Sequence, residues 1–387
     1  MSYREAEHVT MLRDSLRKFV DVEIPRELAA TWDRDDYFAR DVFDKLGPLG
    51  VGGLTVPEEY GGVGEDVTAT MAVIEELAKR SCGFAVSYIL CSCYGGMNIS
   101  DAGSEQQKRD LLPRVAECNI LFSYGFSEPD IGGDVASVKT TAVRKDDRLV
   151  INGQKRFCTG ASVCDYIFCV VRSGPVEDRY NNLSLVMVPP DTPGVTVQPM
   201  NTLGMRGMPT CDVFFDDVEV SDQNILGGPS QWNNAWPVLA GRALEVERLE
   251  VSALTLGIAA AAVADTVDYA QQRSQFGRLI SGHQAIRHVL SNVETTLRAC
   301  ELMLYSAAAL ADSKQPCAVE TSMAKLFIGE QCRDIAIKCQ EVMGAYGCVE
   351  GYDMERYVRE LLQMPIIGGS SNMQRNNIAN QLGIARR

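Results

Sequence analysis

The stretch Phe122-Ser-Tyr-Gly-Phe-Ser-Glu-Pro-Asp-Ile-Gly-Gly-Asp134 lies where the patterning of the chain changes from helices to strands. Its Pro and Gly-Gly residues predict a turn. Backbone N–H groups exposed in a Gly-rich turn can bind a pyrophosphate, and Ser127 would add a hydroxyl. An ordinary surface turn has the same composition, so this stretch alone leaves both interpretations open.

Residues 1–118, which precede this turn, are predicted to be helical. Apolar residues recur at helical spacing in 12–20 and again in 71–78. The segment Ser81–Ser100 carries no charge and could be mistaken for a membrane span. Its four serines, three glycines and one asparagine are too polar for lipid. We therefore expect a buried helix and its turn.

Residues 119–231 are predicted to form an antiparallel β-barrel or sandwich. The strand Arg148–Gln154 ends in Asn152-Gly153, which is the strongest short-range signal for a hairpin. Four further apolar runs, bounded by Pro and Gly, are expected to be strands: 165–171, 183–188, 195–198 and 211–220. From residue 232 the apolar positions return to helical spacing. The fold class is α+β, with three domains at 1–118, 119–231 and 232–387.

The charge balance and the cysteines limit the kinds of partner and site. Lys and Arg number 37 against 51 Asp and Glu, which gives a net charge of −14. Nucleic acid and anionic membranes are excluded as main partners, because they require clustered basic residues. Three histidines, and thirteen cysteines without a CxxC spacing, predict no metal site and buried, reduced thiols. The N-terminal residues lack a secretory pattern, and we expect a cytoplasmic protein.

Seven motifs, in order along nearly the whole chain, resemble those of the acyl-CoA dehydrogenase family. Ser127–Asp134 matches the family's T-E-P-x-x-G-S-D turn, and Asn152–Thr159 matches N-G-x-K-x-[WF]-[IC]-[TS]. The other motifs follow at Leu203–Gly207, Val213–Val220, Arg273–Gly277 with His283-Gln284, Gly344–Gly347, and Arg359 with Gly368–Arg375. The resemblance implies an N-terminal helical domain, a middle β-domain and a C-terminal four-helix bundle. It also places Ser81–Ser100 beside the acyl pocket.

The resemblance implies FAD as the cofactor, bound by two groups of residues. Phe157 would stack against the isoalloxazine ring and Thr159 would hydrogen-bond near its N5 atom; without the resemblance, the same two residues could equally serve packing. The remaining contacts on the flavin and phosphate side would come from Tyr124, Phe126, Ser127, Gly132 and Gly133. The second group would contact the pyrophosphate and adenosine of a partner subunit's FAD or face the cofactor: Arg273, Phe276, Gln284, Glu341 and Gly344.

Two positions depart from the family pattern on the cofactor side. Gly133 stands where a serine hydroxyl usually contacts ligand phosphate, and Glu341 stands where a glutamine usually faces the cofactor. The carboxylate of Glu341 could weaken FAD retention. Neither change removes the contacts to the isoalloxazine ring, so we still expect FAD.

The chemistry requires a base that removes the α-proton of the thioester. Many family members place a glutamate where this chain has Gly368, which has no side chain to act as a base. Members of the isovaleryl-CoA and crotonobetainyl-CoA type instead place it on the first long C-terminal helix, immediately before an arginine. Glu247-Arg248 matches that position, and Glu247 is therefore the predicted base. An ordinary helix carboxylate paired with Arg or Lys is the alternative interpretation.

Gly368 keeps a role through its backbone, because its N–H can still donate to the thioester carbonyl. Arg248 is predicted to contact the substrate. The predicted reaction is FAD-dependent α,β-dehydrogenation of an acyl-CoA or acyl-carrier thioester to the trans-2-enoyl thioester. The resemblance also implies an electron-transfer flavoprotein as electron acceptor and a homotetramer or homodimer. The acyl group and the pathway stay open.

Two other functions fit parts of the same pattern. A flavin oxidase or monooxygenase would keep the fold and pass its electrons to oxygen. A degenerate, non-catalytic subunit of a heteromeric dehydrogenase is the other possibility, because Gly133, Glu341 and Gly368 all depart from the family pattern.

Overall fold

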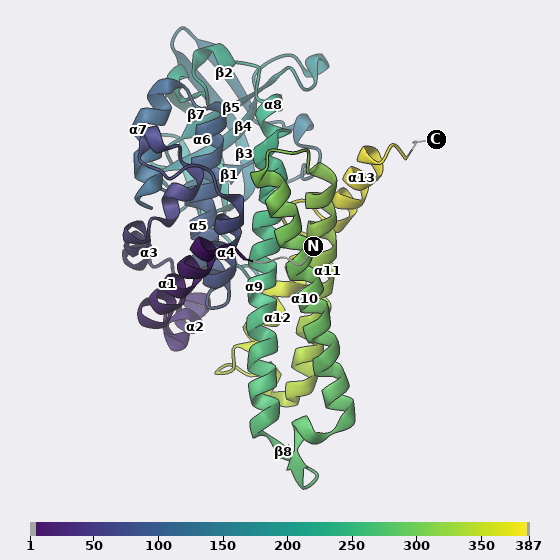
Figure 1. Ribbon diagram of the computed structural model, residues 1–387. Coiled ribbons are helices and arrows are strands. Elements are labelled where there is room, and N and C mark those ends of the chain that lie inside the picture. The colour runs from purple at the N-terminus through teal and green to yellow at the C-terminus, as the bar shows by residue number, and fades with distance from the viewer. Residues whose placement is uncertain (1–4, 385–387) are drawn as a thin grey trace. The chain divides into compact units, whose positions relative to one another are not determined.

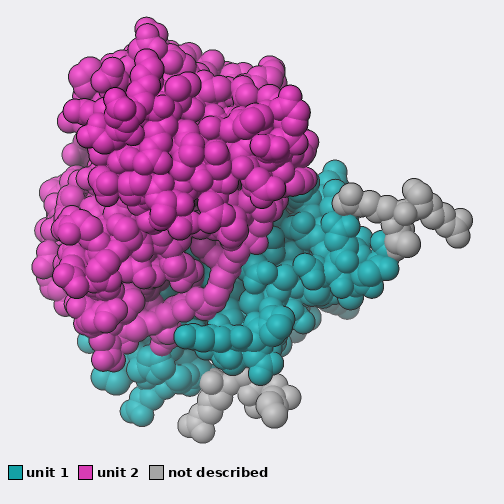
Figure 2. Space-filling model, turned by 90° about the horizontal axis from the view of Figure 1, so that it is seen from above, with its two compact units in different colours: residues 1–34, 67–85, 245–387 teal, residues 35–66, 86–244 magenta. Residues whose placement is uncertain are grey.

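The computed structural model describes residues 5–384 and has an α+β fold, as the sequence predicts. The chain forms two compact units (Figure 2). Unit 1 comprises Met1–Arg34, Val67–Ala85 and Glu245–Arg387, and unit 2 comprises Asp35–Asp66 and Val86–Leu244. The helical N-terminal segment thus contributes to both units. The domain limits at 118/119 and 231/232 describe the order of the chain and stay predictions.

Unit 2 is built on a seven-stranded sheet (Figure 1). Its strands are β1(Phe122–Gly125), β2(Thr141–Lys145), β3(Arg148–Thr159), β4(Tyr166–Arg172), β5(Leu183–Val188), β6(Val195–Pro199) and β7(Thr210–Ser221). The order is β1-β4-β2-β3-β7-β6, with β5 paired to β4. The predicted antiparallel sheet is mixed, because β1 and β2 each run parallel to β4. No tight hairpin ties β1 to its sequence neighbour, so it is not constrained to an antiparallel pairing.

The hairpin expected at Asn152-Gly153 was wrong. Both residues lie inside β3, and the reversal occurs at the two residues between β2 and β3, where Asp146 has a φ of 53°. Gly153 is needed for close approach, since a Cβ there would stand 2.6 Å from the Thr140 hydroxyl oxygen. The Asn152 amide instead bridges β3 to β7 through Asp217.

The uncharged segment is a buried helix, as expected. It runs through α5(Cys82–Tyr88), a π-helical stretch η4(Ile89–Met97) and α6(Asn98–Ala102). Of its most apolar window, 94% is buried within the protein, which identifies a core helix and not a lipid-facing one. Gly95 and Gly96 let η4 approach its neighbours, since added Cβ atoms would lie 2.2 Å from the Phe122 ring and 2.3 Å from the Thr55 hydroxyl. Beyond this segment, unit 2 contains α3(Arg40–Phe43), α7(Glu105–Ala116) and α8(Trp236–Leu239).

Unit 1 is helical. Its principal helices are α1(Glu7–Glu23), α2(Arg26–Asp35), α4(Val67–Ala78), α9(Arg242–Gln272), α10(Gln284–Asp312), α11(Ala318–Met343), α12(Met354–Gln363) and α13(Ser371–Gln381). The short hairpin β8(Ser274–Gln275) and β9(Arg278–Leu279) connects α9 to α10 (Figure 1). Helices α10 and α11 pack along each other. The turn from Met364 to Gly369, between α12 and α13, faces α9 and α11.

A buried ionic network joins three helices of unit 1. The Arg13 guanidinium on α1 donates to Glu75 and Glu76 on α4, at 2.8 Å each, and also contacts the Tyr305 hydroxyl on α10. Buried charges are stable only when they are paired and hydrogen-bonded. The pKa of Glu75, which burial alone would raise, is held below its ordinary value by Lys79 and Arg13. This network has a structural role, and none of its residues is among the predicted site residues.

Candidate active site

The turn after β1 is held in place by a buried ion pair. The Lys155 ammonium donates to Glu128 at 2.8 Å, and the side chains are 0% and 4% exposed. The backbone N–H groups of Lys139 and Thr140 donate to the same carboxylate, at 2.7 and 2.9 Å. Burial alone would raise the pKa of Glu128, but Lys155 and these donors outweigh it and hold the pKa below its usual value. Ser127 was predicted as a site residue from the sequence, whereas this ion pair was missed, although Glu128 and Lys155 both occupy positions of the quoted motifs.

Phe157 stands on a β-bulge. The register of β3 against β7 shifts between Lys155 and Cys158, and Phe157 takes a φ of 60°. Its ring is 60% exposed, and the Arg156 guanidinium lies 5.3 Å from the ring centroid. A bulge re-aims a side chain, and a bulky residue in this backbone region is strained, which is typical of functional sites. The result is an open aromatic face that suits a flat heterocycle.

The bulge is tied to the turn that carries Ser127. The Arg156 N–H donates to the Ser127 carbonyl at 2.9 Å. Two residues beyond the bulge, the Thr159 hydroxyl lies 3.1 Å from the Thr210 hydroxyl on β7. The turn at Ser127 and the bulge at Phe157 are thus joined in unit 2, with Thr159 two residues further along β3; their role toward the cofactor stays a prediction. Gly132 and Gly133 lie on the exposed part of the same turn.

Three aromatic rings are stacked beside this turn. Tyr124 on β1 lies between Tyr94 on η4, at 3.6 Å between centroids and 5°, and Phe126, at 4.3 Å and 9°. The Asn98 amide donates to the Tyr124 hydroxyl. Tyr124 and Phe126 were predicted, whereas Tyr94 and Asn98 were missed, because their contact with β1 depends on the close approach to Phe122 that Gly95 allows.

The residues predicted to meet a partner subunit's FAD cluster around the β8–β9 hairpin. Phe276 and Gly277 form its turn with φ values of 52° and 77°, the combination of a type I′ turn. Phe276 is 94% exposed, and its ring meets His283 edge-on at 6.2 Å. The Arg273 guanidinium lies 5.5 Å from the centre of the Tyr346 ring, and Gln284 begins α10.

Glu341 and Gly344 lie at the C-terminal end of α11. The Glu341 carboxylate is exposed and accepts from Lys338 at 2.8 Å. That pairing partly offsets the negative charge that stands in place of the family's glutamine. Gly344 ends the helix with a φ of 62°.

Glu247 and Gly368 are brought into the same region of unit 1. Val251, one helical turn after Glu247 on α9, packs against Gly368 so closely that a Cβ there would stand 2.8 Å from the Val251 Cγ2 atom. Residues four apart share a helix face, so Glu247 lies on the side of α9 that meets this turn. Gly368 and Gly369 have φ values of 57° and 77°. The turn is therefore shaped for glycine.

Arg248 is half-buried beside α11. Its guanidinium contacts the Thr321 hydroxyl at 3.5 Å. Burial lowers the pKa of Arg248, while the carboxylates of Glu245 and Glu247 act to raise it. The predicted substrate role of Arg248 stays a prediction.

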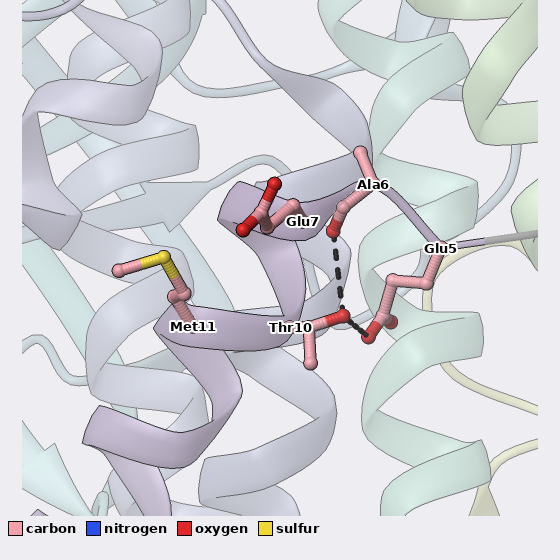
Figure 3. Close-up of a pocket in the computed structure, with 5 residues that line it drawn as sticks. All are labelled: Glu5, Ala6, Glu7, Thr10 and Met11. Atoms are coloured by element: carbon pink, nitrogen blue, oxygen red, sulfur yellow. Dashed lines mark hydrogen bonds between the residues drawn. The ribbon is translucent and has the colours of Figure 1, made fainter.

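A shallow hollow lies on the first turns of α1, lined by Glu5, Ala6, Glu7, Thr10 and Met11 (Figure 3). The Thr10 hydroxyl is hydrogen-bonded to Glu5 at 3.0 Å and to the Ala6 carbonyl at 3.4 Å. The hollow contains none of the predicted site residues. Within residues 5–384, no group of three or more His, Cys, Asp or Glu side chains is arranged to hold a metal ion.

Comparison with known proteins identifies the family. Residues 6–119 match the acyl-CoA dehydrogenase N-terminal domain, residues 123–218 the middle domain and residues 236–383 the C-terminal domain. A probable acyl-CoA dehydrogenase of Bacillus subtilis (strain 168) is 33% identical over 383 residues, which cover 99% of this chain and 100% of the relative.

Two further relatives are similar to this chain over nearly its whole length. A caffeyl-CoA reductase–Etf complex subunit of Acetobacterium woodii is 30% identical over 381 residues, 97% of this chain and 98% of the relative. The solved structure of butyryl-CoA dehydrogenase from Megasphaera elsdenii has a TM-score of 0.93 and 26% identity, and the match covers 99% of this chain and 100% of that one. This chain therefore belongs to the acyl-CoA dehydrogenase family.

Proposed function

We propose that this FAD-dependent acyl-CoA dehydrogenase uses Glu247 as its base. The observation that carries the assignment is the approach of Val251 to Gly368, with 2.8 Å between the Val251 Cγ2 atom and the place of a Cβ. A glutamate at position 368 would need a left-handed backbone and a displaced Val251. Glu247 lies one helical turn before Val251 on α9, and this spacing supports its carboxylate in the role that Gly368 cannot fill.

In the proposed mechanism, the Glu247 carboxylate takes the α-proton of the thioester as the electron pair of that C–H bond forms the new C=C bond. FAD held by Phe157, Thr159 and the turn at Ser127 would supply the acceptor for the β-hydrogen, which leaves as a hydride. The Gly368 N–H donates to the thioester oxygen, on which negative charge develops. A carboxylate removed from bulk water is a stronger base than an exposed one, because burial disfavours its charged form.

The described residues fit FAD in unit 2. Phe157 offers an exposed aromatic face and Thr159 a hydroxyl, and the Glu128–Lys155 pair ties the turn after β1 to β3. Preorganised contacts of this kind reduce the ordering that binding requires.

We further propose an electron-transfer flavoprotein as the electron acceptor and a homotetramer or homodimer as the assembly. The Acetobacterium woodii relative is named as a subunit of a complex with Etf, which supports such a partner. The 94% exposure of Phe276 supports contact with a second subunit. A cytoplasmic location is consistent with the free thiols, of which only Cys348 is exposed among the described residues. The oxidase and non-catalytic alternatives are not favoured, because the relatives are named as dehydrogenases and as a reductase subunit.

Anaerobic flavin bleaching by a panel of acyl-CoAs tests this proposal. Wild-type protein should bleach with at least one acyl-CoA, and Glu247→Gln should bleach about 10²- to 10⁴-fold more slowly while retaining FAD. Glu245→Gln, on the same helix, is the matched control and should bleach at close to the wild-type rate. Full turnover by Glu247→Gln would overturn the assignment, and faster reoxidation by oxygen than by the flavoprotein acceptor would favour an oxidase.

A further inference from the structure

Lys325 on α11 is a buried lysine that the mechanism above does not use. Lys325 is 2% exposed, and its ammonium donates to the Met364 carbonyl at 2.7 Å. Its Cε atom lies 3.6 Å from the place of a Cβ on Gly368. The side chain therefore reaches from α11 into the turn that carries Gly368. No salt bridge to Lys325 occurs among the described residues.

The charge of Glu247 reaches Lys325. Burial lowers the pKa of Lys325 to about 8, and the Glu247 carboxylate acts in the opposite direction. Among the described residues, Glu247 on α9 is the charged group that acts on this ammonium, and it also acts on the neighbouring guanidinium of Arg248; the turn after α12 presents the neutral Met364 carbonyl. The interaction is mutual, since a cation that is stabilised by a carboxylate also stabilises that carboxylate.

A lysine in this place can do two things for the reaction. Its hydrogen bond fixes the Met364 carbonyl, and with it the turn on which the Gly368 N–H lies. Its positive charge favours the ionised form of Glu247, which is the form that can accept a proton. A purely structural tie would do only the first.

We propose that Lys325 is a positioning residue for this enzyme, which fixes the Gly368 turn and keeps Glu247 ionised so that it can act as the base. The inference rests on the proposed function only in naming Glu247 as the base. The pairing of Lys325 with Glu247 is tested separately from that assignment.

The direction of the pH effect follows from the charges. Because burial lowers the pKa of Lys325 to about 8, its positive charge is present below that pH and favours the ionised form of Glu247; above it the charge is lost and the effect fades. Without the charge, the protonated form of Glu247 is favoured more strongly. The acidic limb of the kcat/KM profile, which reports ionisation of the base in the free enzyme, then moves to higher pH.

The first experiment measures kcat/KM against pH for the FAD-loaded full chain. Lys325→Met removes both the charge and the donor, whereas Lys325→Gln removes the charge and keeps an N–H donor for the Met364 carbonyl. Both variants should move the acidic limb upward by about one pH unit. Lys18→Met, an exposed lysine on α1, is the matched control and should leave the limb in place. An acidic limb at the wild-type pH in both Lys325 variants would overturn the proposal.

A double-mutant cycle separates this proposal from the assignment of the base. Thermal unfolding at pH 7 is measured for the FAD-loaded wild type, Lys325→Gln, Glu247→Gln and the double variant. The two substitutions should be non-additive, because each removes the other's partner. Additive effects would overturn the pairing even if Glu247→Gln is inactive. Non-additive effects with an active Glu247→Gln would retain the pairing and overturn Glu247 as the base.

Discussion

Two buried lysines of this chain, Lys155 in unit 2 and Lys325 in unit 1, have different surroundings. Lys155 meets the carboxylate of Glu128 at 2.8 Å, and that carboxylate has two further backbone donors. Within residues 5–384, the Lys325 ammonium donates to a carbonyl, that of Met364, and the charge of Glu247 acts on it. The first lysine holds a turn through a hydrogen-bonded ion pair, whereas burial lowers the pKa of the second to about 8, so it can change its charge near neutral pH. The acceptor, more than the burial, decides which role a buried lysine takes.

The largest expected effect is on the free energy of unfolding, and it differs between substitutions of the two lysines. Lys155→Met leaves the buried Glu128 carboxylate without its cation and should lower the free energy of unfolding by about 3–5 kcal/mol. Lys325→Met should change it by less than about 1 kcal/mol, because the lost hydrogen bond is offset by the removal of a buried charge. Urea denaturation measures both.

Lys139→Met is the matched control in unit 2, since Lys139 pairs with Asp130 at the surface and such pairs contribute little. The Glu128 pKa is held low, so the ion pair should stabilise wild type above the ordinary carboxyl pKa and lose this effect as pH falls through the folded value. Equal destabilisation by Lys155→Met and Lys325→Met would contradict the distinction between them.

The next effect concerns the turn that Lys325 fixes. Gly368→Ala combines a φ of 57° with a Cβ placed 2.8 Å from Val251, and should lower the free energy of unfolding by about 2 kcal/mol. Gly351→Ala has a φ of 97° but open space, so it isolates the backbone contribution. Thermal or urea unfolding compares the two. If Gly368→Ala is no worse than Gly351→Ala, Val251 does not restrict this turn.

A smaller effect is expected on the unit 2 side. Phe157→Ala removes an exposed ring from a strained backbone position, so stability should change by less than about 1 kcal/mol. The loss of ring stacking should weaken FAD binding by about tenfold, as measured by titration of the apoprotein. Val143→Ala, exposed on β2, is the control. Unchanged FAD affinity in Phe157→Ala would remove Phe157 from the cofactor site.

Much of the fold could be predicted, because its signals are local. Apolar runs bounded by Pro and Gly predicted 183–188 as a strand, and β5 spans the same residues. The hairpin at Asn152-Gly153 was wrong because the glycine serves close packing against Thr140 instead of a turn. That use depends on a contact across the sheet, which a local pattern does not contain.

The candidate site was predicted from motif resemblance. The residues that the resemblance missed are those whose contacts join segments far apart in the sequence. Glu247 and Gly368 were named together, but Lys325 was not, because its relation to them arises only when α11 packs beside α9 and the Gly368 turn. Tyr94 was missed for a similar reason, since its stacking on Tyr124 requires the π-helical stretch to meet β1. Spacing in the sequence carries no information on such neighbours.

The central claim is that Glu247 removes the α-proton, and exchange of that proton tests it most directly. The enzyme is first reduced, so that no hydride can leave, and an acyl-CoA substrate is then incubated in D₂O while deuterium incorporation at the α-carbon is followed by NMR. Wild type and Glu245→Gln should exchange the proton, and Glu247→Gln should do so at least about 10²-fold more slowly. Exchange by Glu247→Gln at the wild-type rate would contradict the account.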